Sequence, residues 1–140
     1  MSRKARISAA MVNLMAGGVR HAWTLDELHA SLGRQGKASD FSSVFRAAEK
    51  LAADGIARKV LLDDGRTRFE LAGAHHDHLY CTRCHELAPV PCLIERSDFA
   101  ALERATGAAI LAHHLILSGV CRACRQSPPA TSPYEGERAT

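Results

Sequence analysis

Apolar residues recur every three or four positions in three successive segments of the N-terminal half. This spacing places them on one face of a helix. We therefore expect three helices, at about residues 7–16, 25–33 and 41–54. Thr24 and Glu27 are spaced as a capping box at the start of the second helix, and Ser39 or Asp40 is suited to cap the third.

The hydrophobic pattern then changes to two short strands, at about residues 56–62 and 66–71, around an Asp64-Gly65 turn. Three helices followed by a basic hairpin is the element order of a winged helix-turn-helix, in which the third helix enters the major groove and the hairpin lies on phosphates. The alternative is a small α+β domain whose charges are simply solvated.

The C-terminal half predicts strands at 80–81 and 87–90, a helix at 93–105 and a long apolar strand at 108–118. We place a DNA-binding domain at residues 1–72 and a second, metal-binding domain at 73–125. The tail, 126–140, is rich in Pro, Ser and Thr, which predicts disorder.

Composition indicates a globular protein: 46% of the 140 residues are apolar and 24% are charged. No run reaches the length of a membrane span. Basic residues precede the first apolar segment as in a signal peptide, but Ser8 and Asn13 interrupt that segment. We therefore expect a cytoplasmic protein.

Charge and metal-ligand chemistry fall in different halves of the chain. Residues 1–71 hold twelve Lys/Arg against eight Asp/Glu, a balance of +4. Residues 72–140 hold six against seven, a balance of −1, but contain six of the eight His and all five Cys. The basic half is suited to nucleic acid and the other half to metal.

Two C-x-x-C pairs dominate the second half, and each pair can turn two sulfurs toward one point. We interpret Cys81, Cys84, Cys121 and Cys124 as a structural Zn²⁺ site, with a disulfide framework as the alternative. Cys92 is left over, which leaves open a buried apolar role, redox sensing or metal binding.

The chain resembles the ferric uptake regulator (Fur) family of bacterial metal-sensing repressors. The resemblance rests on Phe69-Glu70-Leu71, His75-His76-Asp77-His78-Leu79, the two cysteine pairs and Ser42-Ser43-Val44-Phe45-Arg46, which is similar to the recognition helix of the family. It implies an α+β protein: an N-terminal winged helix-turn-helix followed by a small α/β dimerisation domain with a four-cysteine zinc site.

The resemblance also implies a sensory divalent metal, Fe²⁺ or Zn²⁺, at Glu70, His76 and His78. A further site found in some members matches His75, Asp77 and His113, with Glu95 as a fourth candidate. The position that often supplies a His to the sensory site matches Ala22, with His21 beside it, so the fourth sensory ligand is open. The expected DNA contacts are Ser43, Phe45, Arg46, Lys50, Arg66 and Arg68.

The resemblance implies a homodimer that binds a palindromic double-stranded DNA operator when metal-loaded and represses metal-uptake genes. We expect neither enzymatic activity nor a membrane partner. Three alternatives stay open: a peroxide sensor of the same family, a zinc hydrolase built on the His-rich cluster, and a zinc-stabilised interaction or metal-delivery module. The hydrolase is disfavoured because no general base stands at a characteristic spacing.

Overall fold

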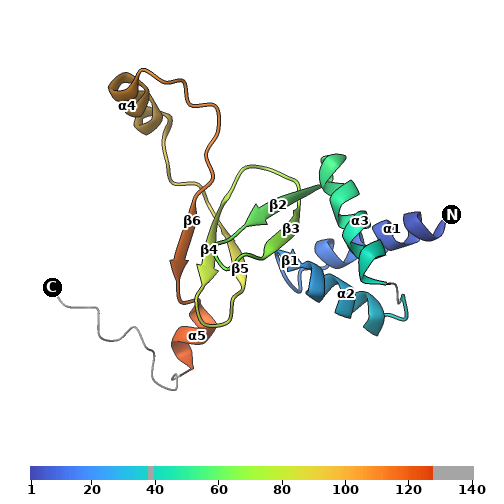
Figure 1. The fold of residues 1–140 in the computed structure, drawn as a ribbon. Helices are drawn as coiled ribbons and strands as arrows, with labels where there is room; N and C mark the ends of the chain where they lie inside the picture. The colour runs from blue at the N-terminus through green and yellow to red at the C-terminus, as the bar shows by residue number, and fades with distance from the viewer. Residues whose placement is uncertain (38–39, 128–140) are drawn as a thin grey trace. The chain divides into compact units, whose positions relative to one another are not determined.

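The computed structural model describes residues 1–37 and 40–127 (Figure 1). The chain divides into two compact units, the first spanning Met1–His75 and the second beginning at His76. The division falls slightly later than the expected boundary after residue 72. Most of the tail predicted to be disordered, 126–140, lies outside the described residues, as does Ser39.

The first unit contains three helices: α1 (Arg3–Ala16), α2 (Leu25–Arg34) and α3 (Phe41–Ala53). Each begins at a side chain that accepts a hydrogen bond from a backbone amide of its first turn, which satisfies an otherwise unpaired donor. The Thr24 hydroxyl accepts from the Glu27 amide at 3.2 Å and donates to the Glu27 carboxylate at 3.0 Å, so Thr24 caps α2 as predicted and Glu27 bonds to the capping side chain.

The sheet of the first unit has the order β1-β3-β2, all antiparallel, with β1 at Trp23–Thr24, β2 at Ala57–Leu61 and β3 at Thr67–Leu71. β2 and β3 form the predicted hairpin, whose turn contains Gly65 at a φ of 77°, a conformation that glycine adopts without steric cost. β1 was not expected, because two residues carry no recognisable periodicity. It makes β3 the central strand.

The core of the first unit lies between the three helices and β3. Met11, Leu28, Val44 and Phe69 have exposed fractions of 0% and belong to one apolar cluster. They come from α1, α2, α3 and β3 respectively, so the predicted helix faces meet on the central strand. Three helices and this hairpin form the winged helix-turn-helix predicted from the sequence.

The second unit is built on a sheet of order β5-β4-β6, with β4 at Asp77–Cys81, β5 at Leu87–Val90 and β6 at Ile116–Gly119. β4 pairs antiparallel with β5 and parallel with β6. A parallel pair requires a long crossover, and here it contains α4 (Arg96–Thr106), which has no buried residue. Figure 1 shows α4 at the end of two extended segments.

Two features of the second unit differ from the sequence prediction. The strand expected at 108–118 is confirmed only near its end, because β6 pairs with a β4 of five residues; residues 108–115 are not part of a strand. A short helix, α5 (Arg122–Gln126), was not expected.

No helix in the described ranges combines the length and the apolar character needed to span a membrane.

Candidate metal centres and DNA-binding face

Four cysteines lie close together at one end of the second sheet, where β4 and β6 terminate. Cys81 ends β4, Cys84 lies in the turn that follows it, Cys121 caps α5 and Cys124 lies within α5. β4 and β6 run parallel, with Cys81 opposite Gly119, so the turns that follow both strands lie at the same end of the sheet. The sheet register therefore brings together two C-x-x-C pairs that are far apart in sequence.

The four sulfurs fit a tetrahedral zinc ion. All four lie within 4.8 Å of one another, and the Sγ atoms of Cys84 and Cys121 are 3.8 Å apart. A tetrahedral site with Zn–S bonds of about 2.3 Å separates its sulfurs by about 3.8 Å. The backbone amides of Cys84 and Cys121 also donate to Cys81 Sγ, at 3.5 and 3.3 Å. All five cysteines are free, so no disulfide framework is present.

The thiols respond differently to this crowding. Burial raises the pKa of Cys81, but the donating amides of Cys121 and Cys84 outweigh it and lower that pKa to about 6. The hydrogen bond with Cys121, followed by burial, raises the pKa of Cys124 to about 12. Four thiolates side by side require a compensating cation, because like charges disfavour ionisation. A divalent metal would supply it and release protons on binding.

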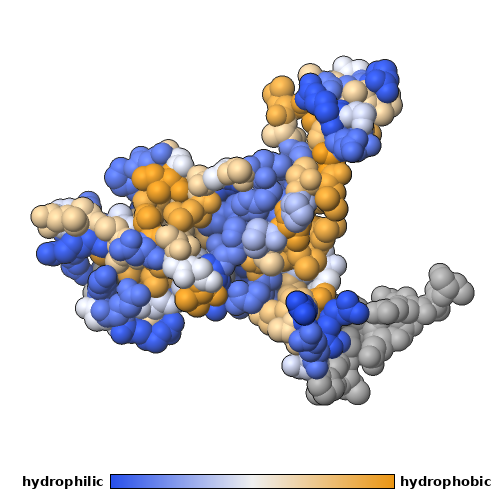
Figure 2. All heavy atoms as spheres, turned by 180° about the vertical axis from the view of Figure 1, so that it is seen from behind, coloured by the Kyte–Doolittle hydropathy of each residue, from blue (hydrophilic) through white to orange (hydrophobic). Residues whose placement is uncertain are grey.

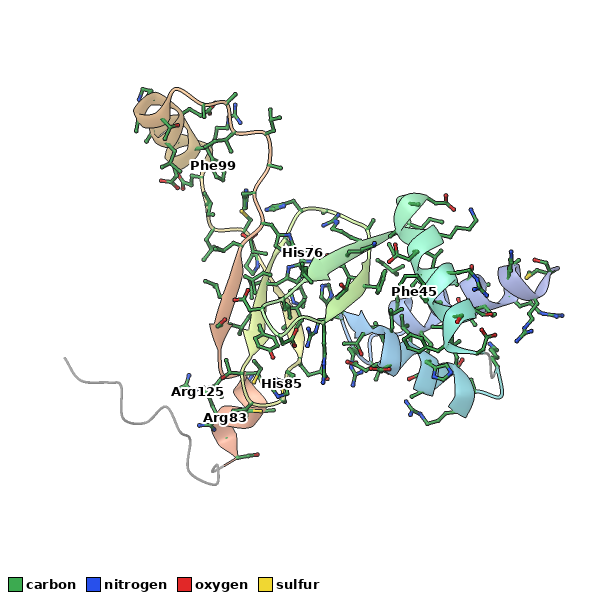
Figure 3. All side chains as sticks on the ribbon, in the orientation of Figure 1. Phe45, His76, Arg83, His85, Phe99 and Arg125 are labelled. Carbon is green, nitrogen blue, oxygen red and sulfur yellow. The ribbon has the colours of Figure 1, made fainter. Side chains whose placement is uncertain are left out.

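A second group of candidate ligands in this unit is the histidine pair at the start of β4. His76 Nε2 and His78 Nε2 lie 3.1 Å apart, with ring centroids 4.6 Å apart (Figure 3 labels His76). His78 is fully buried and stacks on His114 at 5.3 Å. Two imidazole nitrogens bound to one tetrahedral ion stand about 3.3 Å apart, so this pair has the spacing of two ligands.

In the first unit, the buried side chain of Glu70 lies beside a histidine. It lies on β3 with an exposed fraction of 0%, and its Oε2 is 2.5 Å from His21 Nε2. The guanidinium of Arg58, opposite Glu70 on β2, lies 3.7 Å from Oε1. A buried carboxylate needs such cationic or hydrogen-bonding partners. His21 and Glu70 are thus two adjacent side chains of types that can bind a metal ion.

A third group lies around Asp77 in the second unit. His113 Nε2 is 3.4 Å from both Asp77 Oδ1 and Cys92 Sγ. Burial raises the pKa of the Asp77 carboxyl, but hydrogen bonds from Cys92 and the Leu115 amide, with the charge of His113, lower it below its usual range. Cys92 therefore occupies the place for which the sequence suggested Glu95.

Glu95 itself begins α4, where its backbone amide donates to the Asp98 carboxylate at 3.0 Å. It is not among the residues that cluster with Asp77 and His113. His75, also expected as a ligand of the further site, is an exposed residue at the end of the first unit.

The expected DNA-binding side chains on α3 lie on its outer face. Phe45 has an exposed fraction of 44% and projects from the helix in Figure 3. Lys50 and Arg46 are exposed, and together with Ser43 and Lys4 of α1 they line a small hollow between the two helices. The Ser43 hydroxyl donates a hydrogen bond to the Asp40 carboxylate at 2.7 Å and accepts one from Arg46 Nη2 at 3.3 Å.

Arg68 does not fit the phosphate contact expected for it. Its exposed fraction is 2%, and both terminal nitrogens of its guanidinium donate to the Asp64 carboxylate, at 3.0 and 2.9 Å. β3 is the central strand of its sheet, and its three middle residues, Arg68, Phe69 and Glu70, are buried, so both faces of the strand are covered at this point. Arg66 remains exposed.

The sequence profile of the ferric uptake regulator family matches residues 3–118. The chain belongs to this family. Fur family members are metal-responsive, DNA-binding transcription regulators. A ferric uptake regulation protein of Legionella pneumophila is 29% identical over 107 residues, covering 75% of this chain and 78% of that protein.

Solved Fur-family structures share this fold. The Helicobacter pylori ferric uptake regulator, described as having three functional metal binding sites, superposes with a TM-score of 0.74 at 21% identity, covering 89% of this chain and 83% of the other. A zinc uptake regulator complexed with zinc and DNA gives a TM-score of 0.60 at 19% identity, covering 85% and 81%. At these identities the likeness concerns the fold.

Two residues of these candidate ligand groups, His21 and Cys92, were not assigned from the sequence. His21 was set aside because the motif position fell on Ala22, although adjacency to that position was the available signal. Cys92 was left open because its proximity to His113 depends on the two segments that flank α4, and no local pattern indicates how those segments approach.

Proposed function

We propose that this Fur-family protein is a homodimeric repressor that binds a palindromic operator of metal-uptake genes when a regulatory Fe²⁺ or Zn²⁺ is bound. The observation that carries the proposal is the pair of imidazole nitrogens of His76 and His78, 3.1 Å apart at the start of the second unit. A winged helix-turn-helix precedes this pair directly in the chain.

The structural metal in this proposal is Zn²⁺ at Cys81, Cys84, Cys121 and Cys124. The spacing of the sulfurs supports it, as does the all-sulfur donor set, which favours zinc over harder divalent ions. The ion would hold the turn after β4 and the start of α5 together.

The regulatory metal is assigned to Glu70 and His21 of the first unit and His76 and His78 of the second. Only residues 71–75 separate Glu70 from His76 in the chain, so ligands from both sides can reach one ion. Ligation from both units would restrict the angle between them. An ion that binds the DNA-competent arrangement more tightly shifts the population toward it.

The DNA contacts in this proposal are Ser43 and Phe45 near base edges, with Arg46, Lys50 and Arg66 at phosphates. Exposure of Phe45, Arg46, Lys50 and Arg66 supports this assignment, and an exposed aromatic ring can pack on a thymine methyl group. Arg68 is omitted because it is buried against Asp64.

The homodimer is supported by apolar surface on the second unit. Leu93 and Leu111 have exposed fractions of 85% and 95%, and Leu117 on the edge strand β6 has 48%. Figure 2 shows apolar side chains along the segment that links α4 to β6. Apolar surface of this kind marks an interaction site, and an edge strand with unpaired backbone groups suits a second copy.

The test is DNA affinity with and without metal. Operator DNA is first selected from a random duplex library by the Zn²⁺- or Mn²⁺-loaded protein, and its dissociation constant is then measured by fluorescence anisotropy. We expect chelation of the regulatory ion to weaken binding at least tenfold, with steep weakening as salt rises because phosphate contacts release counterions. Equal affinity with and without metal would reject the proposed switch.

The variant His76→Ala removes one regulatory ligand, and we expect it to lose the metal response while retaining the zinc of the cysteine site. His29→Gln serves as the matched control, because His29 lies on α2 beside Phe41, outside the proposed ligand set. The control is expected to keep the full ratio of affinities. If both variants lose the response to the same extent, the loss is not specific to a ligand, and the assignment of the regulatory metal to His21, Glu70, His76 and His78 is rejected.

A further inference from the structure

The group formed by Asp77, Cys92 and His113 brings three different donor atoms to one point from three parts of the second unit. Asp77 begins β4, Cys92 follows β5, and His113 precedes β6. Asp77 is 1% exposed, and Cys92 and His113 are half-buried. The ring of Phe99 on α4 lies 5.0 Å from the His113 ring and covers it on one side (Figure 3 labels Phe99).

The geometry does not correspond to a nucleophilic relay. In a Cys-His-Asp relay the thiol and the carboxylate engage opposite nitrogens of the imidazole, so that the ring passes a proton between them. Here Cys92 Sγ and Asp77 Oδ1 both approach the same nitrogen, His113 Nε2, at 3.4 Å. Convergence of three donors on one point is the arrangement of ligands around a cation.

The distances agree with a metal site. With bonds of about 2.3 Å to sulfur and about 2.0–2.1 Å to nitrogen and oxygen, tetrahedral zinc places its ligand atoms about 3.4–3.6 Å apart. The two contacts at His113 Nε2, both 3.4 Å, fall at this spacing. The Leu115 amide donates to Asp77 Oδ1 at 3.3 Å and so fixes the orientation of the carboxylate.

We propose that Cys92 is a metal ligand, and that Asp77, Cys92 and His113 form a thiolate-containing site selective for a thiophilic divalent cation, Zn²⁺, over Fe²⁺ or Mn²⁺. A carboxylate at the place of Cys92 would give an oxygen-rich site that accepts the harder ions, whereas one thiolate shifts the preference toward zinc.

This site would join the two extended segments that carry α4. Cys92 lies on the segment that enters α4 and His113 on the segment that leaves it, so one ion would tie both to β4 through Asp77. Zinc at this site would therefore limit the motion of α4 relative to its sheet. The inference depends on contacts within the second unit, independently of whether the chain switches DNA binding.

The test uses Co²⁺ as a spectroscopic probe. Full-length protein with zinc in the cysteine cluster is titrated with Co²⁺, and zinc retention is checked by native mass spectrometry. Because zinc exceeds cobalt in affinity for such sites, the cysteine cluster stays filled with zinc. We expect a sulfur-to-cobalt charge-transfer band in the near ultraviolet that is absent from Cys92→Ser. Absence of the band in the wild type, with Co²⁺ bound, would overturn the proposal.

Two variants complete the design. Cys92→Asp is expected to bind Co²⁺ without the charge-transfer band. In competition experiments, its ratio of Zn²⁺ affinity to Mn²⁺ affinity should be at least tenfold lower than that of the wild type. His114→Ala, the neighbouring imidazole, is expected to retain the band at full intensity. An unchanged band in Cys92→Ser would assign the sulfur to another cysteine and refute the site. His76→Ala should keep the band even where the DNA response is lost, which separates this test from that of the regulatory site.

Discussion

Arg68 shows how the environment of a single residue determines its role. On an exposed wing, a guanidinium would contact phosphate. Here β3 is a central strand, and Arg68 is buried in a two-pronged ion pair with Asp64 in the hairpin turn. Such paired hydrogen bonds are among the strongest that proteins form. Arg68 is therefore expected to hold the hairpin in shape, while Arg66 beside it remains exposed.

The Asp64–Arg68 pair predicts a specific dependence of stability on pH. Hydrogen bonding by Arg68 outweighs the effect of burial and lowers the pKa of Asp64 from 3.8 to about 2. A lowered folded-state pKa means that the stabilisation is present above about pH 4 and is lost as pH falls toward 2. We expect Asp64→Asn to reduce the free energy of unfolding at neutral pH by on the order of 1 kcal/mol after solvent screening.

Chemical denaturation at a series of pH values checks this prediction. The difference between wild type and Asp64→Asn should shrink between pH 4 and pH 2. Asp63→Asn, which alters the adjacent carboxyl, should follow the wild-type curve. A constant difference across this range would show that the carboxylate charge does not contribute.

At the scale of elements, local patterns predicted the three N-terminal helices, the hairpin and β5, because capping residues, apolar periodicity and turn glycines act within a few residues. The strand predicted at 108–118 forms only near its end, because strand formation depends on a partner and β4 supplies only five residues. The same dependence on tertiary contacts explains why β1 and the proximity of Cys92 to His113 were not predicted. The cysteine cluster was predictable because its spacing is a local signature.

Replacing either of two glycines by alanine should change the free energy of unfolding, in opposite directions at the two positions. Gly33 lies inside α2, where an added Cβ meets nothing within 4 Å. Gly33→Ala should therefore raise the free energy of unfolding by about 0.5–1 kcal/mol. Gly65 has a φ of 77° in the hairpin turn, so Gly65→Ala should lower it by about 1–2 kcal/mol. Thermal or urea unfolding measures both, and equal signs would contradict the backbone argument.

At the scale of the whole molecule, the two units differ in how well each buries its apolar residues. The first unit has a core with several residues at 0% exposure, whereas α4 in the second unit buries none of its side chains. Hydrophobic burial is the main favourable term in folding and association. The second unit is accordingly the one expected to be completed by another copy of the chain.

We expect Leu111→Glu to weaken the homodimer by at least tenfold in dissociation constant, because Leu111 is 95% exposed beside α4 and a charge there would be buried on association. Analytical ultracentrifugation over a range of concentrations measures the effect. Leu61→Glu is the matched control, since Leu61 is 68% exposed on β2 of the first unit. Should Leu61→Glu dissociate the dimer while Leu111→Glu does not, the contact surface lies on the other unit.

The parallel pairing of β4 with β6 has a consequence for how such a chain can vary. Cys81 stands opposite Gly119, so the position of the second cysteine pair depends on the register of β6 and is independent of the path taken between the strands. Insertions or deletions between Cys92 and His113 are therefore expected to leave the four cysteines aligned as long as this register is kept. The segment around α4 could thus change in length and sequence, and with it the surface offered to a partner, while the four-cysteine cluster stays in place.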